Sequence, residues 1–142
     1  GVDGSASNDS SHLLAEARQA MLLSRVGAAS APQVDGEAPL LTARQSLELA
    51  TRGGADVLGR KDIGALEPGR CADFIALDLN AVGFAGAWHD PVAAVAFCAP
   101  AGVAVSYVHG RRLVDHGRLT TLDLPPVIAA HNRAALRLVR GE

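Results

Sequence analysis

The sequence predicts an α/β fold in which a strand and a helix come first and a small β region with a closing helix follows. Three observations predict it. Val2-Asp3 has the pattern of a buried strand that ends in a loop, the next segment repeats apolar residues at helical spacing, and strand-like runs separated by turns begin after Gly59. In α/β barrels, the groups that bind metals and substrates lie where strands end. Asp3 is therefore predicted to lie in an active site. We expect the chain to begin inside that site and the other walls of the site to lie outside these 142 residues.

The first predicted helix covers residues 12–26, and the cluster Asp9-Ser10-Ser11 is expected to cap it. Its apolar positions are Leu13, Leu14, Ala17, Met21 and Leu22. Residues 27–39 are rich in Ala, Gly and Pro, which predicts a loop. A second helix is predicted from Thr42, because Gln45 three residues later completes a capping box. We expect Gly53-Gly54 to interrupt this helix and Gly59 to end it.

From residue 60 the predicted elements are short. Residues 63–66 are strand-like and lead to a turn at Glu67-Pro68-Gly69, and residues 72–78 form a β run. A helical turn is expected over residues 91–97, with Pro91 at its first position. Residues 103–108 and 112–114 predict a hairpin around His109-Gly110-Arg111, and residues 115–119 predict a second turn. A final amphipathic helix follows Pro125-Pro126 and ends near Arg140-Gly141.

The composition excludes several classes of protein. A chain of 142 residues that is 49% hydrophobic can bury the core of one ordinary domain. The net charge of -2 and the absence of a basic stripe in the sequence argue against nucleic acid and anionic lipid as partners. No apolar run reaches the roughly 20 residues that cross a bilayer, and the start lacks the layout of a signal peptide. Cys71 and Cys98 lack metal-binding spacing and suit reduced thiols, so a cytoplasmic location is expected.

Two sequence stretches carry a specific resemblance. GVDGSASND, followed by a helix with Glu16 and Arg18, and the later stretch AWHDPVAAVAFC resemble the amidohydrolase superfamily. The resemblance is to the branch of nucleobase deaminases and chlorohydrolases. Within that branch, the two stretches are most similar to the sequences of the 8-oxoguanine deaminases. It extends over the whole chain. It implies that these 142 residues are the C-terminal third of a larger enzyme, whose N-terminal part is the partner of this chain.

The resemblance also implies a division of the chain. Residues 1–59 would be the C-terminal end of a metal-dependent (β/α)8 barrel, including its last βα unit. Residues 60–122 would be part of an accessory β-sandwich, with a short helix near 91–97 that packs on the barrel. Residues 123–142 would be the C-terminal helix.

Asp3 is the principal candidate for chemistry. The resemblance implies that this aspartate ligates a single divalent metal, zinc, beside histidines from earlier strands, and that it helps to move a proton from the attacking water. A carboxylate next to an activated water can accept its proton at neutral pH. The alternative is that Asp3 caps the following helix. The other histidine ligands that the family uses are not in these 142 residues, so the chain cannot complete the zinc site by itself.

Other polar residues are weaker candidates. Ser5, Ser7 and Asn8 could orient Asp3 or touch a ring substrate, or they could serve only in the loop and its caps. His12 stands at a helix start without a partner at ligand spacing, which argues against a metal role. Trp88 and His89 could touch substrate, but the related family segment is structural. The remaining histidines are expected to be exposed: His109, His116 and His131.

The expected reaction is the deamination of a purine base by metal-activated water, with 8-oxoguanine converted to urate. A related aminohydrolase or chlorohydrolase acting on guanine, adenosine-type compounds or a triazine is an alternative. A second alternative, from another class, is a non-catalytic β module for assembly or binding. The expected partner is a small purine-like molecule, and assembly into homo-oligomers is left open.

Overall fold

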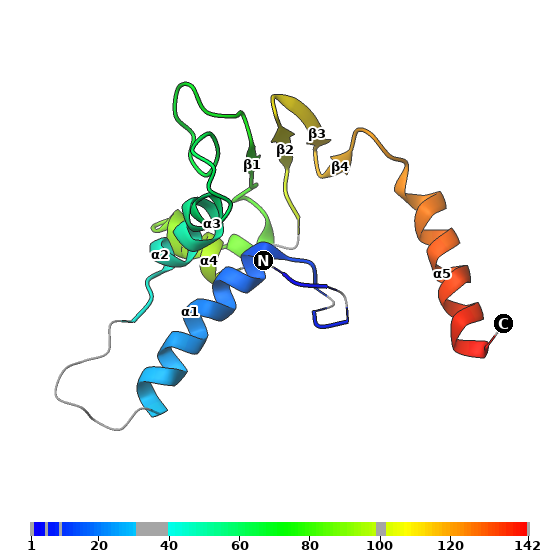
Figure 1. Ribbon diagram of the computed structural model, residues 1–142, viewed down its shortest axis with the longest axis horizontal. Helices are drawn as coiled ribbons and strands as arrows, with labels where there is room; N and C mark the ends of the chain where they lie inside the picture. Colours follow the sequence, from blue (N-terminus) through cyan, green and yellow to red (C-terminus); the bar gives the residue numbers. More distant parts are fainter. Residues whose placement is uncertain (1, 5, 9, 31–39, 99–101, 142) are drawn as a thin grey trace.

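The computed structural model describes residues 2–4, 6–8, 10–30, 40–98 and 102–141. Figure 1 shows a group of helices beside a small sheet, with the last helix standing away from both. In chain order the elements are α1 (Leu13–Ser30), α2 (Ala43–Glu48), the π-helical η1 (Leu49–Gly53), α3 (Gly54–Val57), β1 (Phe74–Ala76), the 3-10 turn η2 (Val82–Phe84), α4 (Pro91–Cys98), β2 (Val105–Val108), β3 (Arg111–Asp115), β4 (Arg118–Leu119) and α5 (Leu124–Arg140). The predicted order of helices, strands and a closing helix is confirmed, except for the strand expected at Val2-Asp3.

The core lies where α1, α2 and α4 contact one another. Its buried side chains are small apart from Met21, which is fully buried in α1, and Phe84 of η2, which contacts α4. Ala94 and Ala96 of α4 are also buried, and small side chains allow helices to approach closely. Arg18 adds a polar link, because its Nε donates to the backbone carbonyl of Phe97 at 2.9 Å. The helix predicted over residues 91–97 therefore packs against the N-terminal part of the chain.

Helix α1 differs from the prediction at both ends. Its N-terminal cap is not made by the serines before it: Nδ1 of His12 accepts a hydrogen bond from the backbone N–H of Ala15 at 3.1 Å. An imidazole nitrogen can replace a capping hydroxyl because it offers the same lone pair to an unpaired first-turn N–H. At the other end the helix continues through Ser30, so residues 27–30 are not a loop. The rest of the predicted loop, residues 31–39, and Asp9 lie outside the described residues.

The second helix begins as predicted. The side chains and backbones of Thr42 and Gln45 exchange the hydrogen bonds of a capping box. The interruption predicted at Gly53-Gly54 is wrong, because both glycines have right-handed helical dihedrals. The irregularity is the π-helical turn η1, which begins at Leu49 and ends at Gly53 without interrupting the helix. Gly59 ends the helix with φ +64°, and the N–H of Arg60 bonds to the carbonyl of Ala55 at 3.0 Å, which completes a Schellman motif.

The four strands form one antiparallel sheet in the order β1-β2-β3-β4. The predicted hairpin is confirmed: His109 and Gly110 join β2 to β3 with φ values of +49° and +74°, the pattern of a tight two-residue turn. His116 and Gly117 join β3 to β4 in the same way. The turn at Glu67-Pro68-Gly69 is also confirmed, by the hydrogen bond from the Arg70 N–H to the Glu67 carbonyl. The strand-like residues 63–66, however, form bends and no strand.

The two ends of the chain carry the remaining differences. Residues 2–4 are not a strand, although the sequence predicts that Val2-Asp3 ends one. A strand needs a neighbour to accept and donate its ladder hydrogen bonds, and the described sheet is composed of residues 74–119 only. Helix α5 is confirmed and ends at Gly141 with φ +72°, but none of its described residues is buried. Within the described ranges, no helix is both long enough and apolar enough to cross a bilayer.

Candidate functional site

Asp3 lies at a sharp bend at the start of the described chain. Its φ is +64°, an uncommon region for a residue with a side chain, although aspartate tolerates it better than most. Its Oδ1 accepts a hydrogen bond from the Gly4 N–H at 2.8 Å. The Gly4 carbonyl in turn accepts from the N–H groups of Ser7 and Asn8 at 2.8 and 2.9 Å. The carboxyl group is exposed and is held at one oxygen by the turn that follows it.

Asn8 connects this turn to helix α1. Its Nδ2 donates to Oε1 of Glu16 at 2.6 Å. Its Oδ1 accepts from the N–H and the hydroxyl of Ser10, at 3.0 and 2.9 Å. Both ends of the amide are therefore used, and both Asn8 and Glu16 are half-buried. We call the group Asp3, Gly4, Ser7, Asn8 and Glu16 the opening loop cluster.

The structure places three of the four predicted site residues in this cluster. Asp3 and Ser7 are exposed and Asn8 is half-buried, whereas Ser5 lies outside the described residues. Asp3 does not cap helix α1, because His12 does so and the Asp3 carboxylate bonds to Gly4. The roles of Asp3, Ser7 and Asn8 toward a metal or a substrate stay predictions. Glu16 was not predicted as a site residue, although it stands in the first turn of the helix that follows the loop.

The described residues do not form a complete metal site. Among the described residues, no three His, Cys, Asp or Glu side chains are grouped closely enough to hold a metal ion. A catalytic zinc takes three or more protein ligands. An exposed carboxylate such as that of Asp3 is the right chemistry for one of them. Asp3 therefore has the chemistry of one zinc ligand, and the described residues do not supply the others.

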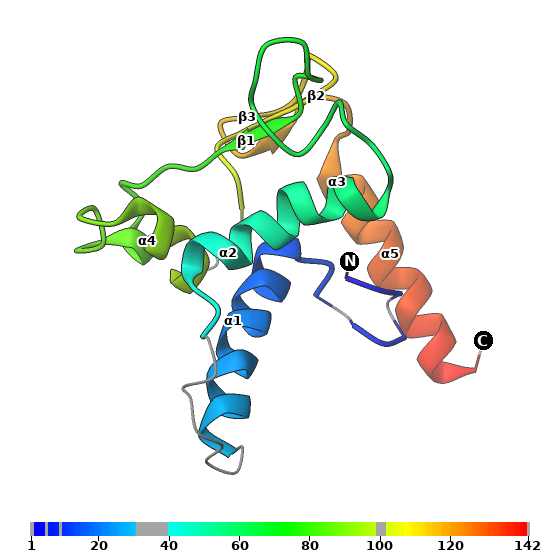
Figure 2. The same cartoon turned by 60° about the vertical axis from the view of Figure 1, so that its left-hand side comes forward.

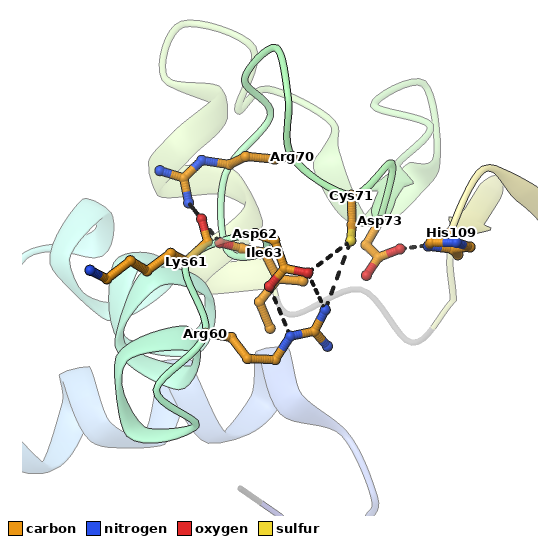
Figure 3. Close-up of polar contacts among 8 residues, drawn as sticks. All are labelled: Arg60, Lys61, Asp62, Ile63, Arg70, Cys71, Asp73 and His109. Atoms are coloured by element: carbon orange, nitrogen blue, oxygen red, sulfur yellow. Dashed lines mark hydrogen bonds and ion pairs between the residues drawn. The ribbon is translucent and has the colours of Figure 1, made fainter.

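A second polar group, which the sequence did not predict, joins the end of α3 to the segment before β1 (Figure 3). Arg60 donates to both carboxylate oxygens of Asp62, with Nε to Oδ1 at 2.9 Å. The thiol of Cys71 donates to Oδ2 of Asp62 at 3.3 Å. Beside it, Arg70 donates to the backbone carbonyls of Lys61 and Ile63 at 2.7 and 3.1 Å. These bonds fix a loop that has no regular secondary structure.

The contacts within this group lower the pKa of Asp62 and raise the pKa values of Arg60 and Cys71. The hydrogen bonds from Arg60, and then the one from Cys71, hold the pKa of Asp62 well below its ordinary value. The hydrogen bond to Asp62, together with desolvation and the negative charge of that carboxylate, raises the pKa of the Cys71 thiol. A raised pKa leaves less reactive thiolate at neutral pH. The Cys71 thiol is therefore less nucleophilic at neutral pH than an unpaired cysteine.

Two of the hollows among the described residues lie near the sheet and the segment before α4. The larger, of about 650 Å³, is mostly apolar and includes Asp78, Cys98 and His116 in its wall. The smaller, of about 470 Å³, is lined in part by Trp88 and His89. The indole N–H of Trp88 donates to the carbonyl of Leu79 at 2.8 Å, which gives this residue a structural contact. The opening loop cluster does not line either hollow.

The other histidines lie where the sequence predicts them. His109 and His116 are exposed at the two tight turns of the sheet, and His116 pairs with Asp115 at 3.1 Å. His131 is exposed on α5. They come from different elements, so they do not form a common site among the described residues.

The loop, helix and sheet described above match a known family. The model of the amidohydrolase family matches residues 1–113. The chain belongs to the amidohydrolase family. The family resemblance drawn from the sequence is thereby confirmed.

Individual relatives within this family have related activities. The chain is 42% identical over 141 residues to an 8-oxoguanine deaminase of Pseudomonas aeruginosa, covering 99% of this chain and 29% of that enzyme. It is 39% identical over 145 residues to a hydroxydechloroatrazine ethylaminohydrolase of Pseudomonas sp. strain ADP, covering 100% of this chain and 29% of the relative. The chain thus spans less than a third of the length of the curated relatives that it matches.

Solved structures agree with this assignment. An atrazine chlorohydrolase from Arthrobacter aurescens, complexed with zinc, matches with a TM-score of 0.79 and 36% identity, over 92% of this chain and 28% of that chain. An adenosine deaminase from Xanthomonas campestris with bound zinc matches with a TM-score of 0.85 and 28% identity, over 99% of this chain and 30% of that chain. The arrangement of helices and sheet in Figure 1 is therefore that of the corresponding part of larger zinc-binding enzymes.

Proposed function

We propose that this chain is the C-terminal part of a zinc-dependent hydrolase that deaminates a purine base, with 8-oxoguanine as its substrate. The products would be urate and ammonia. The observation that supports this most strongly is the match to an 8-oxoguanine deaminase along 99% of the chain, beginning at the loop that carries Asp3. The parent enzyme would supply the other zinc ligands and most of the substrate pocket.

The proposal includes a division of the chain. Residues 1–59 would end the (β/α)8 barrel, residues 60–122 would belong to an accessory β-sandwich, and residues 123–142 would form the C-terminal helix. The contacts of α4 with α1 and α2 support a close attachment of the second part to the first. The strand expected at Val2-Asp3 would form only when the neighbouring barrel strands provide its hydrogen bonds.

Asp3 would act at the zinc site. When bound, zinc lowers the pKa of a water molecule and so prepares it to attack the ring carbon that carries the amine. Asp3 would offer one carboxylate oxygen to the metal and would accept the proton of that water. The hydrogen bond from the Gly4 N–H to Oδ1 orients the carboxylate for both tasks. The proton would then pass to the leaving amine, which departs as ammonia.

The neighbouring polar residues would support Asp3 or the substrate. Ser5, Ser7 and Asn8 are proposed to orient Asp3 or to touch the purine ring. Asn8 already has partners at both ends of its amide, which favours the orienting role for this residue. A purine-like small molecule is the proposed partner, and the cytoplasm is the proposed location.

A different substrate within the same reaction class is the second candidate. Two observations favour it: a relative that acts on hydroxydechloroatrazine is 39% identical over the whole chain, and 5-methylthioadenosine/S-adenosylhomocysteine deaminases reach 37%. The residues that would separate a purine from a triazine lie mostly in the part of the relatives that this chain does not cover. A non-catalytic β module would be the remaining alternative.

The full-length product of the native gene tests the proposal. It would be assayed for zinc content and for ammonia release from 8-oxoguanine, guanine, adenosine and an aminated triazine. We expect about one zinc per chain, as one catalytic site requires, and the highest kcat/KM with 8-oxoguanine. A higher kcat/KM with one of the other compounds would contradict 8-oxoguanine as the substrate but would still support a hydrolytic deaminase. A zinc-free product without deaminase activity would contradict the proposal and favour the non-catalytic module.

A further inference from the structure

The contacts of the opening loop cluster point to a positioning residue that the sequence did not suggest. We propose that Glu16 holds the loop that carries Asp3, acting through Asn8, and thereby fixes the position of the Asp3 carboxylate in the zinc site. This inference rests on the proposed function and adds to it a residue that does not touch metal or substrate. The pathway is a continuous set of hydrogen bonds from helix α1 to Asp3.

The first step is the contact between Glu16 and Asn8. Oε1 of Glu16 accepts from Nδ2 of Asn8 at 2.6 Å, a short distance for a nitrogen donor. Hydrogen bonds to an ionised carboxylate are shorter and roughly twice as strong as neutral ones. Both residues are half-buried, so water competes less with this bond than it would at an exposed site. The bond therefore restrains Asn8 firmly.

The second step connects Asn8 to Asp3. The backbone N–H of Asn8 donates to the Gly4 carbonyl at 2.9 Å, and the Gly4 N–H donates to Oδ1 of Asp3 at 2.8 Å. Asp3 itself has a positive φ, which is an uncommon conformation for a residue with a side chain. Such a conformation persists only when its surroundings enforce it. The bond to Glu16 is the contact that ties this strained turn to a helix.

The third step is that helix α1, which carries Glu16, is held in place by its own contacts. Ala17, the next residue after Glu16, is buried in the helical core. Arg18 binds the backbone carbonyl of Phe97 at the end of α4. Glu16 thus stands beside two anchored residues of α1 and contacts the opening loop through Asn8. A catalytic group has to be held within about 0.5 Å of its productive position, and a helix achieves this better than a loop does.

The test compares Glu16→Ala and Glu16→Gln in the full-length enzyme. Gln keeps an oxygen that can accept the Asn8 hydrogen bond, whereas Ala removes it. We expect Glu16→Ala to weaken zinc binding about 10–100-fold, measured by competition with a chelator, and to lower kcat more than it raises KM. Glu16→Gln should restore most of the zinc affinity. Glu48→Ala, which removes an exposed carboxylate at the end of α2, is the matched control. It should change neither the zinc affinity nor the kinetic constants.

The outcomes separate this inference from the proposed function. Unchanged zinc affinity in Glu16→Ala would overturn the positioning role. So would a loss of zinc affinity that accompanies a lower thermal midpoint and that Gln does not restore, because Glu16 would then be only structural. If the enzyme binds zinc but acts on another substrate, the proposed substrate fails while the affinity measurement still decides the role of Glu16. An enzyme that binds no zinc would contradict both.

Discussion

Asp62 and Cys71 show how one carboxylate changes the chemistry of a neighbouring thiol. Because Asp62 raises the pKa of Cys71, we predict that Asp62→Asn lowers that pKa. More thiolate would then form at a given pH, so the midpoint of the alkylation rate against pH should move to lower pH. The measurement uses Cys98→Ser as the background, which leaves Cys71 as the single thiol.

Asp56→Asn is the control for that experiment, since it removes an exposed carboxylate of α3 that does not affect Cys71. Its alkylation rate against pH should coincide with that of the Cys98→Ser background. An Asp62→Asn profile that coincides with the background as well, or that moves to higher pH, would refute the account of this group.

Gly64 is required because the backbone at this position lies close to η1 and α3. With φ +84°, a Cβ at this position would lie 2.9 Å from Cβ of Ala55 and 3.1 Å from the carbonyl oxygen of Thr51. Gly64→Ala combines a conformational cost with a steric clash, so we predict a loss of about 2–4 kcal/mol in the free energy of unfolding. Gly69→Ala separates the two effects, because Gly69 has φ +86° and no atom lies within 4 Å of the position that its Cβ would take. It should lose only about 1 kcal/mol in urea denaturation; equal losses would argue against the clash.

At the scale of elements, α4 depends on its N-terminal cap. Oδ1 of Asp90 accepts from the Ala93 N–H at 2.9 Å, and Pro91 occupies the first helical position. Asp90→Ala should lower the free energy of unfolding by about 1 kcal/mol, because a first-turn N–H loses its acceptor. Asp90→Asn keeps an acceptor and should lose much less. Thermal denaturation of the two variants and the unchanged chain checks this. Equal midpoints for Asp90→Ala and the unchanged chain would show that the cap does not contribute.

The elements that the sequence predicted well are those with local signals. The capping box at Thr42, the Pro at the start of α4 and the His109-Gly110 turn each involve residues only a few positions apart. Their structure follows from dihedral preferences and short-range hydrogen bonds, which a sequence displays directly. The break predicted at Gly53-Gly54 is wrong because packing of the helix outweighs the propensity of two glycines to interrupt it.

The parts that the sequence could not predict depend on distant partners. Glu16 and Asn8 are brought together by the path of the opening loop, and Asp62 meets Cys71 only because the loop after α3 folds back. The cap of α1 by His12 was missed because serines and aspartates are the more common capping residues. The strand expected at Val2-Asp3 has no partner among the described residues. Asp3 itself was selected by its motif, and its metal role stays a prediction.

At the scale of the whole molecule, α5 leaves an apolar face uncovered. Leu138 and Val139 are 81% and 85% exposed, and Figures 1 and 2 show the helix projecting from the rest of the chain. Large exposed apolar surfaces bind hydrophobic dyes. We predict that the 142-residue chain binds such a dye and that Leu138→Ser with Val139→Ser reduces its fluorescence. Arg133→Ser, on the same helix, should leave it unchanged; equal effects of both changes would contradict the prediction.

In the whole enzyme, Asp3 is proposed to be a zinc ligand and the proton acceptor of a purine deaminase. The most direct measurement is the zinc content and the ammonia release of the full-length Asp3→Asn variant, beside the unchanged enzyme and the Asp56→Asn control. We predict that Asp3→Asn loses turnover by at least about 10²-fold, as removal of a proton-transfer group does, and binds zinc more weakly, while the control keeps both. An Asp3→Asn enzyme that keeps full zinc content and full turnover would contradict the account.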